Sequence, residues 1–169
     1  MVAQFGLSSE GGREIERKLA GLVEAFGDLE PLMAKLGIYL ESATIERFET
    51  QTAPDGRKWE PSERAKRDNG KTLVDTSQLR SSITHSASSR SVEVGTNKIY
   101  AGVHQYGMNE TVSVSAHSRT SPGGLTFAVD AFDRMMNTPA RPFLGLSVED
   151  ETELNFLVDQ HFRDVLNQP

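Results

Sequence analysis

The sequence predicts an α+β fold, in which an antiparallel β-sheet is covered by a long helix from the N-terminal half and by a C-terminal helix, with an inserted β-hairpin arm. Apolar residues recur every three or four positions near both ends of the chain, a spacing typical of amphipathic helices. The part between them holds short β-rich segments separated by glycine-containing turns, as in antiparallel strands. The length of 169 residues suits a single domain spanning 1–169.

Two helices are predicted in the first part of the chain. Residues 13–26 carry one apolar stripe, so 1–27 is expected to form an N-terminal helical extension. Asp28 can offer a side-chain oxygen to the open amides of a second helix. Apolar positions continue at helical spacing from Leu29 to about Thr50, which predicts the extent of that helix.

The segment "TAPDGRKWEPS" is predicted to end the second helix, because proline cannot continue a helix and Asp-Gly favours a turn. Trp59 is the only tryptophan, and its large apolar area indicates an anchor that holds this loop to the body. The alternative is a platform on which a ligand stacks. Thr76 or Ser77 is expected to cap a short helix that carries Leu79 and Ile83.

Strands are predicted from "SVEVGT" onward, and "IYAGVHQYG" is a further segment rich in β-forming residues. The segments "TVSVSAHS" and "GGLTFAV", separated by the turn "RTSPGG", indicate that 108–138 is an inserted hairpin arm. This arm has few large apolar side chains for its length. It is therefore expected to be partly disordered in the free chain and to become ordered against a partner.

If "IYAGVHQYG" is a strand, Tyr100, His104 and Tyr106 lie on one face and point outward. Such side chains offer rigid contact area with a polar tip, which is typical of protein interfaces. We therefore predict that they form part of an interface. The alternative is that they cover loops of their own domain.

The prolines of "PARPFLG" disfavour helix and stiffen the segment that leads into the last helix. Pro142 and Phe143 are predicted to be structural anchors, as are Trp59 and Leu79. Arg141 is expected to pair with an acidic group of the same or a neighbouring subunit, and it completes the predicted interface set. Beyond this segment, the sequence predicts a capped helix with three acidic residues in its first turn, where the helix dipole favours negative charge.

Charge is divided unevenly along the chain. The net charge is −6, but residues 1–50 carry 9 acidic and 5 basic side chains, 51–144 carry 9 and 12, and 145–169 carry 6 and 1. A chain with acidic ends and a basic middle can pack against copies of itself if the fold keeps those segments on different surfaces. The alternative is that these charges are solvated faces of ordinary helices.

The residue content argues against most kinds of chemistry. The chain has no cysteine and its four histidines lie in unrelated local settings, so we predict no metal, no cofactor and no catalytic residues. The sequence lacks an apolar run long enough to span a membrane, so we expect a soluble, unexported protein. Two alternatives stay open: a small hydrolase that uses paired carboxylates, and a DNA-contacting module that uses the six basic residues of 57–71.

The order and spacing of "PDGRKW", "LVDTSQLRSSI", "YAGVHQYG", "AHSR" and "PARPFLGLS" resemble the phage virion morphogenesis family, the tail-completion proteins of Mu-like and related contractile-tailed phages. The resemblance covers about residues 32–166. It implies a structural protein of the head-to-tail joint or tail end that forms a ring of identical subunits, without enzymatic activity or a small-molecule substrate. In that family a glycine commonly follows the threonine of "DT", whereas Ser77 stands here.

The resemblance also implies partners and a location. The expected partners are copies of the same chain and other phage head and tail proteins, with at most weak DNA contact. The expected location is the virion, and the host cytoplasm during assembly.

Overall fold

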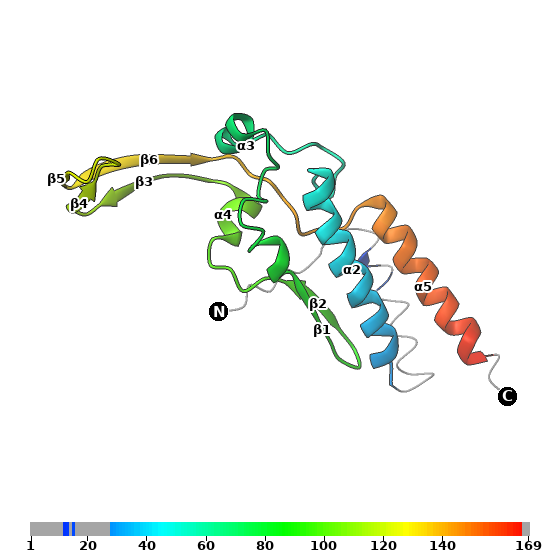
Figure 1. The fold of residues 1–169 in the computed structure, drawn as a ribbon. Coiled ribbons are helices and arrows are strands. Elements are labelled where there is room, and N and C mark those ends of the chain that lie inside the picture. Colours follow the sequence, from blue (N-terminus) through cyan, green and yellow to red (C-terminus); the bar gives the residue numbers. More distant parts are fainter. Residues whose placement is uncertain (1–11, 14, 16–27, 167–169) are drawn as a thin grey trace.

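The computed structural model describes residues 12, 13, 15 and 28–166 (Figure 1). The helix predicted at 13–26, and with it most of the predicted extension 1–27, lies outside the described residues, although Ile15 is helical and buried. The described helices and strands confirm the α+β class. In chain order they are α2 (Glu30–Thr50), α3 (Glu63–Asp68), η1 (Arg80–Ser82), β1 (Thr84–Ala87), β2 (Val92–Gly95), α4 (Ala101–Tyr106), β3 (Met108–Val114), β4 (His117–Thr120), β5 (Thr126–Val129), β6 (Phe132–Thr138) and α5 (Val148–Leu166).

Helix α2 is the centre of the body, with the β1–β2 hairpin packed on one side and α5 on another (Figure 1). Its bounds confirm the predicted long helix. At its start, Asp28 Oδ1 accepts a hydrogen bond from the Glu30 backbone N–H at 3.0 Å, as the sequence predicts. It ends at Thr50, and the left-handed backbone of the capping residue Gln51 (φ 58°) turns the chain into the following loop.

The described strands form three separate two-stranded antiparallel sheets, which pair β1 with β2, β3 with β6, and β4 with β5. Only the first of these lies against α2. This close approach depends on Gly37, because a Cβ atom there would come within 2.4 Å of the His85 ring on β1. The other two sheets form the arm predicted at 108–138, which projects from the body in Figure 1.

The strand predicted over "IYAGVHQYG" is wrong, because residues 101–106 form the short helix α4. Tertiary hydrogen bonds outweigh the β-propensity of these residues. The Gln105 side chain accepts hydrogen bonds from the backbone N–H groups of Phe143 (3.0 Å) and Leu144 (3.1 Å) and donates one to the Leu144 carbonyl (2.8 Å). Those bonds tie α4 to the proline-rich segment before α5.

The core has two parts. One lies between α2 and α5 and includes Leu32, Leu36, Leu154 and Val158. The other gathers the loops around the C-terminal end of α2: the Phe48 ring meets the rings of Trp59 and Phe143, with 5.4 Å between ring centroids in each pair. Of the four predicted anchors, Trp59, Leu79 and Phe143 are buried and Pro142 is half-buried, and the Trp59 indole N–H donates to the Pro142 carbonyl at 2.9 Å.

Helix α5 begins with a reciprocal cap. The Ser147 hydroxyl accepts a hydrogen bond from the Asp150 backbone N–H at 3.1 Å, and an Asp150 carboxylate oxygen accepts one from the Ser147 N–H at 2.7 Å. The same carboxylate forms a buried ion pair with Arg47 of α2. The other Asp150 oxygen accepts from the Tyr39 hydroxyl at 3.2 Å. One side chain therefore sets both the start of α5 and its position on α2.

Candidate functional site

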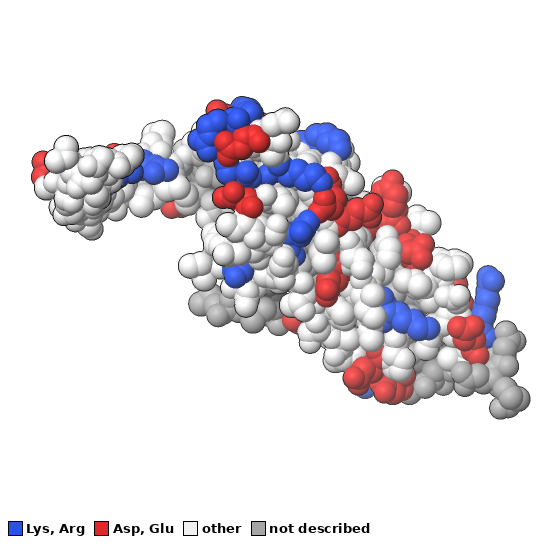
Figure 2. Space-filling model, viewed as in Figure 1, with Lys and Arg blue, Asp and Glu red and all other residues white. Residues whose placement is uncertain are grey.

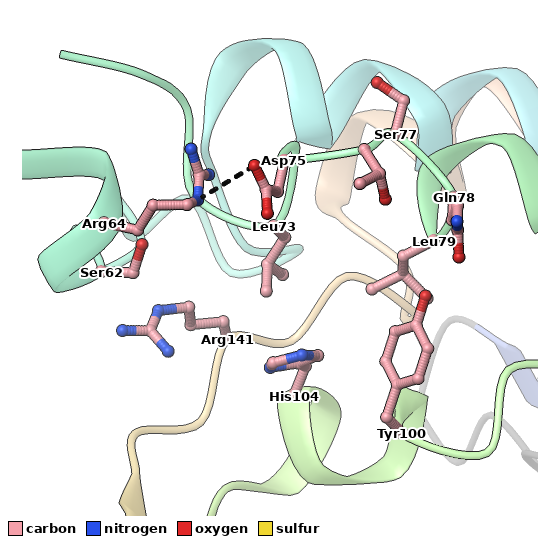
Figure 3. Close-up of a pocket in the computed structure, with 11 residues that line it drawn as sticks. Ser62, Arg64, Leu73, Asp75, Ser77, Gln78, Leu79, Tyr100, His104 and Arg141 are labelled. Atoms are coloured by element: carbon pink, nitrogen blue, oxygen red, sulfur yellow. Dashed lines mark ion pairs between the residues drawn. The ribbon is translucent and has the colours of Figure 1, made fainter. Parts of the chain in front are cut away.

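The candidate site is a pocket of about 230 Å³ at the root of the arm, hereafter the Arg141 pocket (Figure 3). Three of the four predicted interface residues line it, because the end of β6 and helix α4 lie on either side of the point where the arm leaves the body. Figure 3 shows Arg141 and His104 below the loop that carries Asp75 and Ser77, with the Arg141 guanidinium extending toward the side where Ser62 and Arg64 lie. The lining residues are Ser62, Arg64, Leu73, Asp75, Thr76, Ser77, Gln78, Leu79, Tyr100, His104 and Arg141.

Arg141 is a buried cation without a carboxylate partner among the described residues. Only 6% of its surface is exposed. Its Nε donates to the Glu60 carbonyl at 2.8 Å and its Nη1 to the Pro139 carbonyl at 3.4 Å, so backbone oxygens hold the guanidinium. Carbonyl dipoles orient this charge but do not neutralise it, and a buried charge is stabilised by an opposite one. The pocket therefore favours an anionic group from outside the chain.

His104 lies beside that charge. Its Nδ1 is buried and has no hydrogen-bond partner among the described residues. Burial, and to a lesser degree the Arg141 guanidinium, lowers the pKa of the His104 imidazole, so the ring is held neutral at neutral pH. A neutral imidazole can present Nδ1 as a donor or as an acceptor. Besides the Arg64–Asp75 ion pair, the pocket is thus lined by one arginine without a carboxylate partner among the described residues and by a histidine whose buried Nδ1 is unused.

The predicted tyrosines do not act as one surface. Tyr100 directly precedes α4, and His104 lies four residues later within that helix. Their rings therefore meet edge to face, with 6.0 Å between ring centroids. Tyr106, two residues further along the helix, is 65% exposed and does not line the pocket. The predicted single face of Tyr100, His104 and Tyr106 is wrong because the alternation of a strand does not apply to a helix.

The rim of the pocket holds a strained backbone that the sequence did not reveal directly. Ser77 has a φ of 58°, in the left-handed region that glycine adopts without cost. This is the position where the resembled family commonly has glycine. The expected side-chain cap from Thr76 or Ser77 is absent from η1; the Ser77 carbonyl instead accepts a hydrogen bond from the Ser81 N–H at 2.9 Å.

Three further residues that matter for the site, Gln105, Arg47 and Asp150, were given no such role from the sequence. Gln105 holds α4 against the segment that carries Arg141. The Arg47–Asp150 pair fixes the other end of that segment. Arg47 Nη1 also donates a hydrogen bond to the carbonyl of Phe143 and one to that of Gly145, each at 2.9 Å. Both partners of the pair are buried. Burial and the Asp150 charge raise the pKa of Tyr39 to about 12, so its hydroxyl stays a donor to Asp150 throughout the neutral range. The Ser-x-x-Asp spacing before α5 is the one signal that could have indicated Asp150.

Three further kinds of contact can be compared with the described part of the chain: metal binding, membrane spanning and nucleic-acid binding. Across residues 12, 13, 15 and 28–166, no three His, Cys, Asp or Glu side chains gather as a metal site would require. No described helix combines the length and the apolar character needed to cross a bilayer. In 57–71, five of the six basic side chains have a carboxylate within ion-pair distance, which reduces the charge available to phosphates. These pairs are Arg57–Asp55, Arg64–Asp75, Lys66–Glu63, Arg67–Asp68 and Lys71–Glu49.

The fold is thus an α+β body with a projecting two-stranded ribbon and a charged pocket at the root of that ribbon. The chain belongs to the phage virion morphogenesis family, whose sequence model matches residues 11–163. It is also similar to Mu-like prophage FluMu G protein 2 of Haemophilus influenzae, with 30% identity over 151 residues that cover 89% of this chain and 91% of that protein. No solved structure matches the chain significantly. The resemblance stated from the sequence is confirmed, and the protein has a role in phage assembly and is associated with the virion.

Proposed function

We propose that this chain is a structural subunit of phage tail completion or head-to-tail joining, and that identical copies assemble into a ring. It acts by contact with its own copies and with other head and tail proteins during assembly in the host cytoplasm, without catalytic chemistry. The family supports the assembly role. The observation that carries the self-association is the uncompensated Arg141 charge in an open pocket, which an acidic side chain of a neighbouring copy would complete.

The distribution of charge on the fold supports the same proposal. In Figure 2, Lys and Arg side chains lie over α3, near the root of the arm, interspersed with Asp and Glu side chains, whereas acidic side chains gather at the start of α5. The acidic start of α5 and the uncompensated Arg141 charge belong to two different surfaces of one subunit, so a contact between them is head-to-tail, and a head-to-tail contact that closes on itself makes a ring. An interface of this kind also suppresses face-to-face pairing of like surfaces.

The test is a charge change at the pocket compared with one at the surface. Arg141→Gln removes the charge and keeps donors for the Glu60 carbonyl, while Arg141→Glu reverses the charge. Arg90→Gln, at an exposed position in the β1–β2 turn, is the matched control. Each variant is measured by urea unfolding, by light scattering across concentration and by its ability to complete infectious particles.

We expect both Arg141 variants to impair self-association and particle completion more than folding, with the reversal having the larger effect, and Arg90→Gln to behave as the unchanged protein. Folded Arg141 variants that assemble and complete particles normally would refute the role of this pocket. Loss of assembly in the Arg90 control as well would show that the effect is not specific to the pocket.

A further inference from the structure

The arm is amphipathic. In the β3–β6 ribbon, directly opposed residues lie on the same face. One face carries Met108, Val112, Val114, Phe132 and Met136, together with Glu110, Arg134 and Thr138. The other is polar apart from Met135, and on it the Ser113 hydroxyl donates to Asp133 at 2.6 Å. Such alternation is what a sheet shows when one face packs on a core.

The tip of the arm repeats this division. In the β4–β5 ribbon, Arg119 lies opposite Phe127 and His117 opposite Val129 on one face, while small residues fill the other. Phe127 is 51% exposed, and Leu125 in the adjoining turn is 76% exposed. The tip therefore presents an aromatic ring and an exposed cation side by side, hereafter the Phe127 face.

Within the described residues, the body of the same chain does not cover the arm. Figure 1 shows the tip of the arm and helix α5 at opposite ends of the molecule. Isolated two-stranded ribbons are at best marginally stable in water, so an apolar face on such a ribbon favours a partner that buries it. Residues 108–120 span at most roughly 40 Å when extended, and α2 with 21 residues is roughly 30 Å long. The arm is thus long enough to cross the body of another copy.

The body carries a surface that is complementary to the tip. A groove of about 580 Å³ runs between α2 and the start of α5. Tyr39, Ala43 and Pro54 supply apolar lining, and the exposed side chains of Glu46 and Glu149 supply negative charge at its edge. The one exposed lysine in the lining, Lys58, donates to the Thr50 carbonyl at 2.6 Å. Figure 2 shows acidic side chains gathered at the start of α5. An aromatic side chain next to an arginine matches a groove with apolar walls and acidic edges.

We propose that the tip of the arm docks, through the Phe127 face, into the groove between α2 and α5 of a second copy of this chain, with Arg119 facing Glu46 and Glu149. The inference rests on the proposed self-association and names the surfaces that make it. The contact joins two different surfaces, so it is head-to-tail and extends from copy to copy around a ring. The apolar face of β3 and β6 then lies over the neighbouring body as the arm crosses it.

The natural chain has no cysteine, which makes disulfide cross-linking a direct test. Leu125→Cys places a thiol beside the Phe127 face and Ser42→Cys places one in the groove. Ser89→Cys, at an exposed site in the β1–β2 turn, is the control for the groove. The Leu125 variant is mixed in turn with each of the other two under mild oxidation. We expect a mixed dimer with the Ser42 variant and none with the Ser89 variant.

A charge exchange tests the same contact independently. Arg119→Glu and Glu46→Arg should each weaken self-association by about tenfold or more, and the variant that combines both should recover most of the loss, because the reversed pair attracts again. Circular dichroism of each variant establishes that it is folded.

The outcomes separate the two proposals. An assembly without the Leu125–Ser42 cross-link, or without recovery in the combined variant, overturns the docking but leaves the proposed function standing. A cross-link to the Ser89 control at equal yield also overturns the docking. A protein that stays monomeric at every concentration contradicts both.

Discussion

Replacement of Phe143 by alanine is the sharpest test of how the fold holds the Arg141 pocket in place. The Phe143 ring is completely buried and its centroid lies 5.4 Å from that of Phe48. Its backbone N–H donates a hydrogen bond to the Gln105 side chain, and its carbonyl accepts a hydrogen bond from the Arg47 guanidinium. The substitution leaves those backbone bonds available and removes only packing.

The expected loss follows from that burial. Transfer of a large apolar side chain out of water contributes about 1.5–3 kcal/mol, and the cavity left behind brings the total for Phe→Ala to about 3–5 kcal/mol. For a chain of this size such a loss lowers the melting temperature by roughly 10 °C. Phe156→Ala is the matched control, because the Phe156 ring is 56% exposed and its removal should cost less than about 1 kcal/mol.

The assay is urea unfolding followed by circular dichroism and by the fluorescence of Trp59, which is buried against Phe48 and reports directly on this part of the core. A free energy of unfolding for Phe143→Ala within about 1 kcal/mol of the unchanged protein would refute the anchoring role. An equal loss for both variants would show that burial does not decide the effect.

Four further outcomes are expected. Asp150→Asn should lower the free energy of unfolding by about 3–5 kcal/mol, because it leaves Arg47 buried without its counter-charge, and a loss below about 1 kcal/mol in urea unfolding would contradict this. Ser77→Gly should raise thermal stability by about 1 kcal/mol, since glycine adopts a φ of 58° without strain, and a lower melting temperature would exclude strain at this position. Burial lowers the folded-state pKa of His104, so the contribution of the neutral ring to stability is present above the unfolded pKa of about 6.5 and is lost as the pH falls below that value. His104→Gln should therefore flatten the dependence of melting temperature on pH between about 7.5 and 5.5. An unchanged slope would count against the buried neutral ring. Backbone amides of 108–138 should exchange rapidly in the free subunit and slowly after assembly, whereas full protection in a monomer would contradict an arm that waits for a partner.

Local sequence patterns predicted the long helix, the arm and the α+β class well. The bounds of α2 follow from its apolar spacing and from Asp28, both of which are local signals that survive in the folded chain. The arm was recognisable because the Ser-Pro-Gly-Gly turn separates two β-rich segments. Strand β6, with its sequence FDRMMNT, gave no such signal because its methionines and polar residues favour no single period.

The candidate site was only partly predictable, because tertiary contacts decide it. Tyr100, His104 and Arg141 were selected for their chemistry, and the fold brings them to one pocket, but α4 replaces the expected strand since Gln105 binds backbone groups that lie nearly forty residues away. The Arg47–Asp150 pair could not be predicted for the same reason, because it joins residues more than a hundred positions apart in the sequence. No period in the sequence records which distant backbone or side chain a polar residue will meet.

The central claim is that copies of this chain contact one another through the Arg141 pocket and the arm. It is tested most directly by size-exclusion chromatography with light scattering across concentration, applied to the unchanged protein and to folded Arg141→Gln. We predict that the mass of the unchanged protein rises from 18.6 kDa to a fixed multiple that electron microscopy shows as a closed ring, while the variant stays small. A mass of 18.6 kDa at every concentration, or equal rings from both proteins, would contradict the claim.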